Sequence, residues 1–230
     1  MTQYPEQKKL VSTARVTGVW YLIIAISGIF GFMVFHPQIF VGGDPQKTLT
    51  NLTNLEFTAR IRLLFELLII VSQALAAVWF YKLFRGINEW AAWAVSIWGM
   101  VNSVAIMISA ISISSALDVA KSAQTYQEKL VMIQLLGSLI TNAWDVGSLF
   151  FGLWLIPMGY IVVTSKRMPV GLGLILIVGG VGYLVSTFVK YLGVDSNLLE
   201  LLVIPATVGE FWMIGYLLIY GIRPITNNEK

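Results

Sequence analysis

Long, mostly apolar stretches recur along the chain, and short polar segments separate them. Each stretch reaches about 20 residues, the length that a helix needs to cross the hydrocarbon core of a bilayer. This pattern predicts an all-α protein, a polytopic integral membrane helical bundle with one domain over residues 16–223. Its six predicted transmembrane helices cover residues 16–35, 59–83, 90–117, 142–164, 170–192 and 198–222.

The composition agrees with this fold class. Hydrophobic residues make up 57% of the chain and charged residues only 12%, whereas a soluble domain carries about 25% charge. The net charge of +3 comes from basic residues spread over connections, so we expect the lipid bilayer as a partner and no nucleic acid. The chain has no cysteine, and its one histidine, His36, cannot build a histidine-rich metal site. A metal site made only of carboxylates would be possible, but the sequence gives it no support, so we expect no metal and no cofactor.

The distribution of lysine and arginine predicts that both termini are cytoplasmic, because cytoplasmic connections collect basic residues. The first apolar stretch is too long for a typical signal peptide and lacks a small-residue cleavage site, so we interpret it as a retained transmembrane helix. Residues 1–15 and 224–230 are then a cytoplasmic segment and a cytoplasmic tail. The cytoplasmic side receives nine of the 15 basic residues, namely Lys8, Lys9, Arg15, Lys82, Arg85, Lys166, Arg167, Arg223 and Lys230.

Residues 126–141 allow two interpretations. Their apolar positions recur near the helical period, which fits an amphipathic helix on the outer membrane surface. Alternatively, they extend the fourth transmembrane helix outward, and we favour this extension. In the fifth predicted helix, Gly179, Gly182 and Ser186 are spaced to let a neighbouring helix approach closely.

The second apolar stretch, residues 59–83, carries polar side chains inside a predicted transmembrane helix. A helix of 3.6 residues per turn places Arg62, Glu66 and Gln73 on one face. Arg60 points away from that face, and its long side chain can reach the membrane surface. The three aligned residues are therefore predicted to face the interior of the bundle.

Other predicted helices bring polar side chains to the same membrane region. Because an uncompensated charge at the bilayer centre costs about 2.5–3.5 kcal/mol on insertion scales, we expect these side chains to meet partners in an outward-facing polar cavity. Three carboxylates would face two cations there, and Glu210, predicted to lie deepest, is the acid that we expect to carry a proton. The candidate cavity residues are Arg62, Glu66, Gln73, Asn102, Asp145, Lys190 and Glu210.

A purely structural role is the alternative for each of these residues. Arg62 and Glu66 would pair within their own helix and lower the cost of insertion. Asp145 and Lys190 would anchor helix ends at the membrane surface, and the two amides would form hydrogen bonds between helices. No catalytic motif with a histidine, a cysteine or a nucleotide-binding glycine pattern accompanies these residues.

Several segments match the pattern of one protein family. Residues 80–88, FYKLFRGIN, correspond to a typical LYxLLRPVN stretch, and residues 147–160, GSLFFGLWLIPMGY, followed by Met168-Pro169 and GLGLILIVGGVGYL, correspond to its most typical block. Residues 14–18, ARVTG, and 205–212, PATVGEFW, fit its beginning and end. Over residues 13–223 the chain resembles this uncharacterised bacterial membrane-protein family, domain-of-unknown-function family 4386.

The resemblance implies a multi-pass protein of the bacterial plasma (inner) membrane with a single six-helix domain, and it implies no activity. It marks Glu210 and the region of Arg62 as typical of the family. Two positions depart from the family pattern: Gly86-Ile87 stand where Pro-Val is usual, and Trp154 stands where histidine is common. If that histidine were catalytic in the family, this chain would lack it.

Three functions are consistent with the sequence. The first is a non-enzymatic membrane protein whose polar cavity binds a small or amphiphilic ligand, such as a lipid headgroup, through Arg62 and Lys190. The second is a proton-coupled transporter of a small solute that uses Glu210, and six helices would then call for a homo-oligomer. The third is a membrane-embedded, lipid-modifying enzyme with Glu66 or Asp145 as general base. The absence of a catalytic motif makes an enzyme the least favoured.

Overall fold

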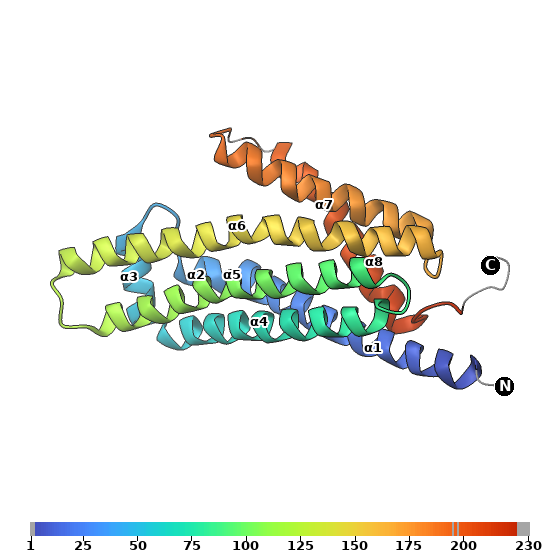
Figure 1. Cartoon of the computed structure of the whole chain (residues 1–230). Coiled ribbons are helices and arrows are strands. Elements are labelled where there is room, and N and C mark those ends of the chain that lie inside the picture. The colour runs from blue at the N-terminus through green and yellow to red at the C-terminus, as the bar shows by residue number, and fades with distance from the viewer. Residues whose placement is uncertain (1–2, 195, 197, 225–230) are drawn as a thin grey trace. The chain divides into compact units, whose positions relative to one another are not determined.

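A computed structural model describes residues 3–194, 196 and 198–224, and the elements within them are all helical (Figure 1). This confirms the predicted all-α fold class. The elements are α1 (Gln3–Gly28), the π-helical segment η1 (Ile29–Phe35), α2 (His36–Ile39), α3 (Pro45–Asn54), α4 (Glu56–Phe84), α5 (Glu89–Lys121), α6 (Tyr126–Ser165), α7 (Val170–Tyr191) and α8 (Leu198–Ile219).

Six helical stretches are long and apolar enough to cross a membrane, which confirms the predicted polytopic bundle. They are Glu6–Ile39, Glu56–Phe84, Glu89–Lys121, Tyr126–Ser165, Val170–Tyr191 and Leu198–Ile219. The cytoplasmic location of both termini stays a prediction. Residues 1–2 of the predicted cytoplasmic segment and residues 225–230 of the predicted tail lie outside the described residues.

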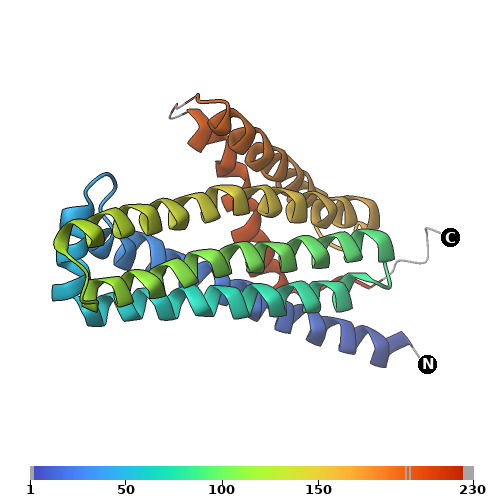
Figure 2. The same ribbon diagram turned by 60° about the vertical axis from the view of Figure 1, so that its left-hand side comes forward.

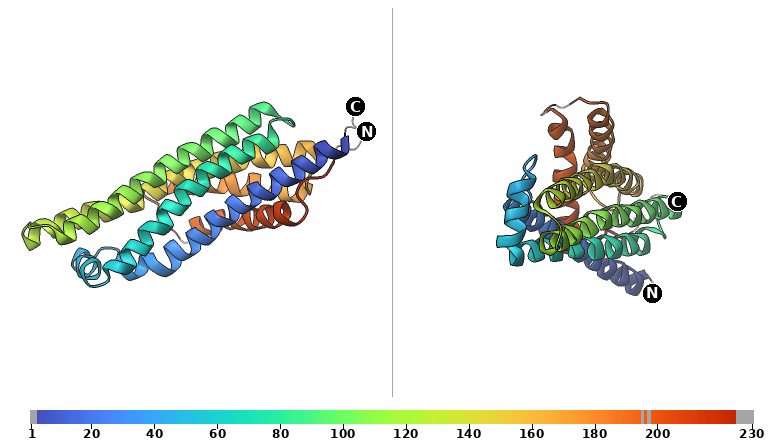
Figure 3. Two further views of the ribbon diagram at one scale, coloured as in Figure 1. Left: turned by 90° about the horizontal axis from the view of Figure 1, so that it is seen from below. Right: turned by 90° about the vertical axis from the view of Figure 1, so that its left-hand side faces the viewer.

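The first transmembrane helix continues past His36-Pro37, where the sequence suggested its end. α1 passes into η1 and then into α2, so the helical run ends at Ile39 (Figure 3). In η1 the His36 amide donates to the carbonyl of Gly31, five residues earlier. Pro37, which has no amide hydrogen to donate, then stands at the start of α2, where proline is well tolerated.

The polar connection that follows contains α3, a helix that the apolar pattern did not predict. Asp44 caps this helix, because its Oδ1 accepts a hydrogen bond of 2.8 Å from the Lys47 amide. Pro45 occupies the first turn, and Gly43 supplies the left-handed backbone (φ +73°) that leads into the cap.

Residues 126–141 extend the fourth transmembrane helix, since α6 runs without interruption from Tyr126 to Ser165. The start of α6 is a capping box. Both the amide and the hydroxyl of Thr125 donate to the Glu128 carboxylate at 2.8 Å, and the Glu128 amide donates back to the Thr125 hydroxyl at 3.4 Å. This local sequence begins the helix well before its apolar portion.

The chain divides into two compact units, each with its own packing. Unit 1 comprises residues 1–22, 73–102 and 148–230, and unit 2 comprises residues 23–72 and 103–147. In unit 1, residues 73–84 of α4 and 89–102 of α5 form an antiparallel hairpin with a short connection (Figure 2). Asn88 caps α5 by accepting a hydrogen bond of 2.9 Å from the Ala91 amide, so the turn containing Gly86-Ile87 is well formed.

Glycines set the packing of α6, α7 and α8 in unit 1 (Figure 1). A Cβ atom on Gly159 would lie 2.5 Å from the carbonyl oxygen of Gly173, so α6 and α7 meet backbone to backbone. On the other side of α7, a Cβ atom on Gly182 would overlap the carbonyl oxygen of Leu202 in α8. The small residues of the fifth transmembrane helix therefore permit the close approach that their spacing predicts.

Unit 2 has an apolar core at the ends of its helices. Ile39 of α2 and Leu52 of α3 are almost completely buried there against residues of α4, α5 and α6. The core residues are Ile39, Leu49, Leu52, Ala59, Ala116, Leu117, Leu130 and Ile133. Thus α3 buries one face although it is too short to cross a membrane, and it closes the core beside the polar groups of α4.

Candidate functional site

The centre of unit 2 holds a buried ion pair within α4. Arg62 Nη1 donates to Glu66 Oε2 at 2.6 Å, and both side chains are 0% exposed. Arg60, by contrast, is exposed and pairs with Glu56 at 2.8 Å. The two arginines are two residues apart, so the helical turn alone directs one inward and the other outward, in agreement with the predicted stripe.

Residues from α5, α6 and η1 surround this ion pair. The indole Nε1 of Trp144 donates to Glu66 Oε1 at 2.9 Å and to the Ser109 hydroxyl at 3.2 Å. The ring of Phe32 lies 4.5 Å from the Arg62 guanidinium carbon and edge-on to Trp144, with ring centroids 4.3 Å apart. Both carboxylate oxygens of Glu66 are therefore occupied, and one face of the Arg62 guanidinium is covered.

One edge of the Arg62 guanidinium carries hydrogen-bond donors that are not used. Its Nε and Nη2 atoms are buried and find no hydrogen-bond partner among the described residues. These two nitrogens form the side-on edge of the guanidinium, whose parallel N–H groups suit a group bearing acceptor oxygens. Leaving a buried donor unpaired costs about 1–3 kcal/mol, and no contact among the described residues offsets this cost at the two nitrogens.

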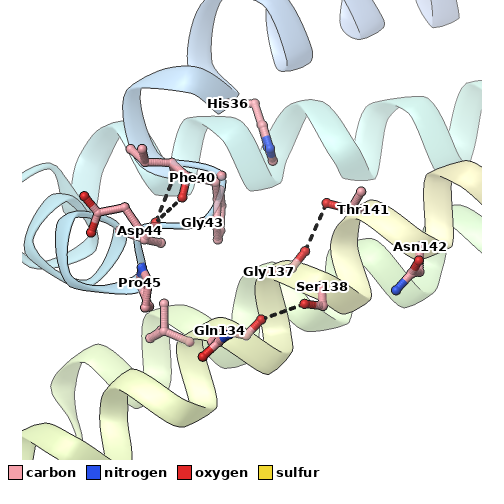
Figure 4. A pocket seen from close by; sticks show the side chains of 14 residues that line it. His36, Phe40, Gly43, Asp44, Pro45, Gln134, Gly137, Ser138, Thr141 and Asn142 are labelled. Carbon is pink, nitrogen blue, oxygen red and sulfur yellow. Dashed lines mark hydrogen bonds between the residues drawn. The ribbon is translucent and has the colours of Figure 1, made fainter. Parts of the chain in front are cut away.

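A cavity of about 390 Å³ lies in unit 2 (Figure 4), and its lining includes His36 but neither Arg62 nor Phe32. His36 lies between the cavity and Phe32, because it lines the cavity and its ring centroid is 5.7 Å from that of Phe32. The His36 Nδ1 atom is buried without a partner among the described residues. Polar groups of α6 line the opposite wall, where Gln134, Ser138, Thr141 and Asn142 are found.

Two buried amides occupy unit 1. Gln73 of α4 and Asn102 of α5 are 0% exposed, and all four of their side-chain nitrogen and oxygen atoms lack a hydrogen-bond partner among the described residues. A Cβ atom on Gly99 would lie 2.9 Å from that of Ala77, so the two helices are in contact at that level. Because the helices are antiparallel, Gln73 and Asn102 both lie about one turn from this contact.

Glu210 in α8 also belongs to unit 1, and its partner is a tyrosine. The hydroxyl of Tyr21 donates to Glu210 Oε1 at 2.6 Å. Tyr21 is buried, and its ring lies edge-on to Phe80 at 5.5 Å and to Trp154 at 5.4 Å. Among the described residues no lysine or arginine pairs with Glu210, so a hydroxyl holds this half-buried acid in place of a cation.

The predicted cavity residues are divided between the two units. Arg62 and Glu66 form one cluster in unit 2, where Asp145 is half-buried on α6. Gln73, Asn102 and Glu210 belong to unit 1, as does Lys190, which is exposed on α7.

The residues that complete both sites were not among the predicted candidates. Trp144, Phe32 and Tyr21 are aromatic residues of apolar stretches, where packing alone explains their presence. Ser109 and His36 are polar, but nothing in their spacing relates them to Arg62. The sequence feature that could have pointed to Trp144 and Tyr21 is their polar N–H or O–H group, since a buried indole or phenol usually finds a hydrogen-bond acceptor.

The six long apolar helices and the buried polar groups within them define a multi-pass α-helical membrane protein. Residues 16–221 match the family model described as "Domain of unknown function (DUF4386)", and the chain belongs to this family. This confirms the family resemblance. No curated protein and no solved structure matches the chain.

Proposed function

We propose that this protein binds a small or amphiphilic ligand in the cavity of unit 2, and that the ligand extends past His36 to Arg62, which does not itself line the cavity. The observation that carries the proposal is the unused Nε–Nη2 edge of Arg62, a guanidinium that is completely buried. Arg62 is positioned by Glu66, and Glu66 is positioned in turn by Trp144. A structural ion pair alone would not require two further buried donors without partners.

The charge balance of the site favours a neutral acceptor group on the ligand. Arg62 and Glu66 already neutralise each other, so a full anion beside them would add an uncompensated buried charge. An ester or amide carbonyl, or a set of hydroxyl groups, accepts from the same edge without that cost. A lipid headgroup region offers such oxygens next to apolar chains, which agrees with the aromatic residues Phe32 and Phe40 near the cavity.

We also propose that the protein resides in the bacterial inner membrane with both termini in the cytoplasm and the unit 2 cavity facing outward. The distribution of basic residues supports this orientation. Cysteine-accessibility labelling tests it, because the chain has no native cysteine. A cysteine at Ser138 is expected to react with an impermeant reagent from outside the cell, and a cysteine at Ser165 only after the membrane is opened.

The ligand proposal is tested by Arg62→Lys, which keeps a cation for Glu66 but removes the Nε–Nη2 edge. Protein purified in a mild detergent is analysed by mass spectrometry for bound lipid or metabolite. We expect the wild type and the control Arg60→Lys to retain the same compound, and Arg62→Lys to lose it while remaining folded. Equal retention by all three proteins would contradict the role of Arg62.

A second candidate function is proton-coupled transport through Glu210, and the Tyr21–Glu210 hydrogen bond favours it. An acid in a transmembrane helix without a cationic partner is a typical proton carrier. In proteoliposomes, Glu210→Gln should then abolish pH-driven solute uptake, whereas Glu200→Gln should not. Catalysis by Glu66 is less well supported, because hydrogen bonds already occupy both of its carboxylate oxygens.

A further inference from the structure

A second buried arginine, Arg167, lies between α6 and α7 in unit 1, outside the membrane-spanning helices. Its side chain connects the N-terminal helix with the end of the chain: Nε donates to the Arg223 carbonyl at 2.7 Å, and Nη2 donates to Gln7 Oε1 at 3.1 Å. Gln7 in turn donates to the Ile222 carbonyl at 2.6 Å, and the Arg223 amide donates to the Arg167 carbonyl at 3.0 Å. Four hydrogen bonds thus join three segments of unit 1.

The positive charge of Arg167 is not neutralised by these partners. Arg167 is only 7% exposed, and its acceptors among the described residues are a backbone carbonyl and an amide oxygen, both neutral. Burial lowers the pKa of Arg167, but a guanidinium stays protonated in proteins. The charge of Arg167 therefore gives the surface next to these hydrogen bonds a positive electrostatic potential.

A groove of about 670 Å³ adjoins this cluster, and Gln7, Ile222 and Arg223 line it. Its other wall is an aromatic stripe along α8 and just beyond it, formed by Trp212, Tyr216 and Tyr220 at successive helical turns. Tyr216 and Tyr220 contact each other, with ring centroids 5.3 Å apart.

The basic residue Arg223 lines the groove, and two further basic residues follow the lining residue Gln7 in the sequence. The side chain of Arg223 is exposed at its rim. Lys8 and Lys9, with one acid, Glu6, are exposed on α1 next to Gln7, which lines the groove. Aromatic residues mixed with basic residues at the end of a transmembrane helix are typical of the headgroup level of a bilayer.

We propose that this groove binds the headgroup of an anionic phospholipid of the surrounding bilayer. Arg223 contacts the phosphate directly, the buried charge of Arg167 adds a positive potential, and the aromatic stripe packs against the upper acyl chains. This site is separate from the unit 2 cavity and requires anionic lipid, whereas the unit 2 site favours a neutral acceptor.

The test is native mass spectrometry of the purified protein with dioleoyl-phosphatidylglycerol or dioleoyl-phosphatidylcholine, which share acyl chains but differ in charge. We expect the wild type to retain phosphatidylglycerol and to gain thermal stability from it. Arg223→Gln should weaken retention roughly five-fold, the effect of one basic residue close to an anionic lipid surface. This variant should fold normally, because only the backbone of Arg223 supports the Arg167 cluster.

The matched control is Arg85→Gln, which removes an exposed arginine at the end of α4 in the same unit, outside the groove. It should retain phosphatidylglycerol like the wild type. Equal retention of the two lipids, or an equal loss in Arg85→Gln and Arg223→Gln, would overturn the proposal in favour of non-specific contact. The proposal would also be overturned if inorganic phosphate alone raised the thermal stability of the protein as much as phosphatidylglycerol does.

Discussion

The polar clusters of the two units are built around buried charge in different ways. In unit 2, Arg62 and Glu66 neutralise each other at 2.6 Å, and Trp144 occupies the remaining carboxylate oxygen. In unit 1, Glu210 has the Tyr21 hydroxyl as its hydrogen-bond partner at the same distance of 2.6 Å. The first arrangement keeps both charges in place, because removing either one leaves the other unpaired.

The second arrangement tolerates a change of protonation more readily. If Glu210 is protonated, no cation loses its ion-pair partner among the described residues, because Glu210 is hydrogen-bonded to a hydroxyl. The ligand proposal therefore rests on the fixed ion pair of unit 2, and the transport proposal rests on the acid of unit 1 that has a hydroxyl partner. The following predictions test this difference, beginning with the largest expected effect.

Glu66→Gln should destabilise the protein far more than Glu210→Gln does. The first substitution leaves the Arg62 charge buried without a counter-ion, which typically costs about 3–5 kcal/mol. The second replaces a hydrogen-bonded acid by an amide that can still accept from Tyr21, at a cost of about 1 kcal/mol. Unfolding in mixed micelles with increasing SDS measures both. Similar losses for the two variants would show that the clusters are not different in kind.

Tyr21→Phe should destabilise the protein by about 0.5–1.5 kcal/mol, the usual net contribution of one hydrogen bond. The ring contacts with Phe80 and Trp154 are kept, so the change isolates the hydroxyl. The same micelle unfolding assay applies, with Tyr220→Phe, an exposed position, as the control. An unchanged stability for Tyr21→Phe would mean that Glu210 is held by something else.

Gln73→Met should raise stability by about 1 kcal/mol, because it replaces a buried amide without partners by an apolar side chain of similar size. Gln134→Met, at an exposed position, should leave stability unchanged. Thermal unfolding followed by intrinsic tryptophan fluorescence provides the measurement. A decrease for Gln73→Met would show that the amide has a bound partner from outside the chain.

Arg60→Ala should have the smallest effect, with no measurable change in melting temperature. Arg60 is exposed, and isolated surface ion pairs contribute little. The comparison with Arg62, two residues away, then separates burial from residue type. A marked loss of stability in Arg60→Ala would indicate that the exposed ion pairs of Glu56 with Arg60 and Lys121 contribute to the stability of the fold.

Much of the polar stripe could be predicted from the sequence, because helical phase alone separates Arg62, Glu66 and Gln73 from Arg60. The continuation of α6 to Tyr126 was also favoured, and its capping box is visible in the sequence. The helix α3 and the passage of α1 through η1 into α2 were missed. Both depend on hydrogen bonds of Asp44 and His36 that the apolar pattern does not specify.

The sequence by itself determined the class of protein, the number of transmembrane helices and the inward face of α4. Hydrophobic length and helical periodicity are local properties, and they need no knowledge of neighbouring helices. Only the tertiary structure decided that Trp144 and Ser109 meet at Glu66, that Tyr21 meets Glu210, and that Arg167 joins both ends of the chain. These contacts connect residues as far as 189 positions apart, and helix packing, which no local pattern encodes, selects which faces come together.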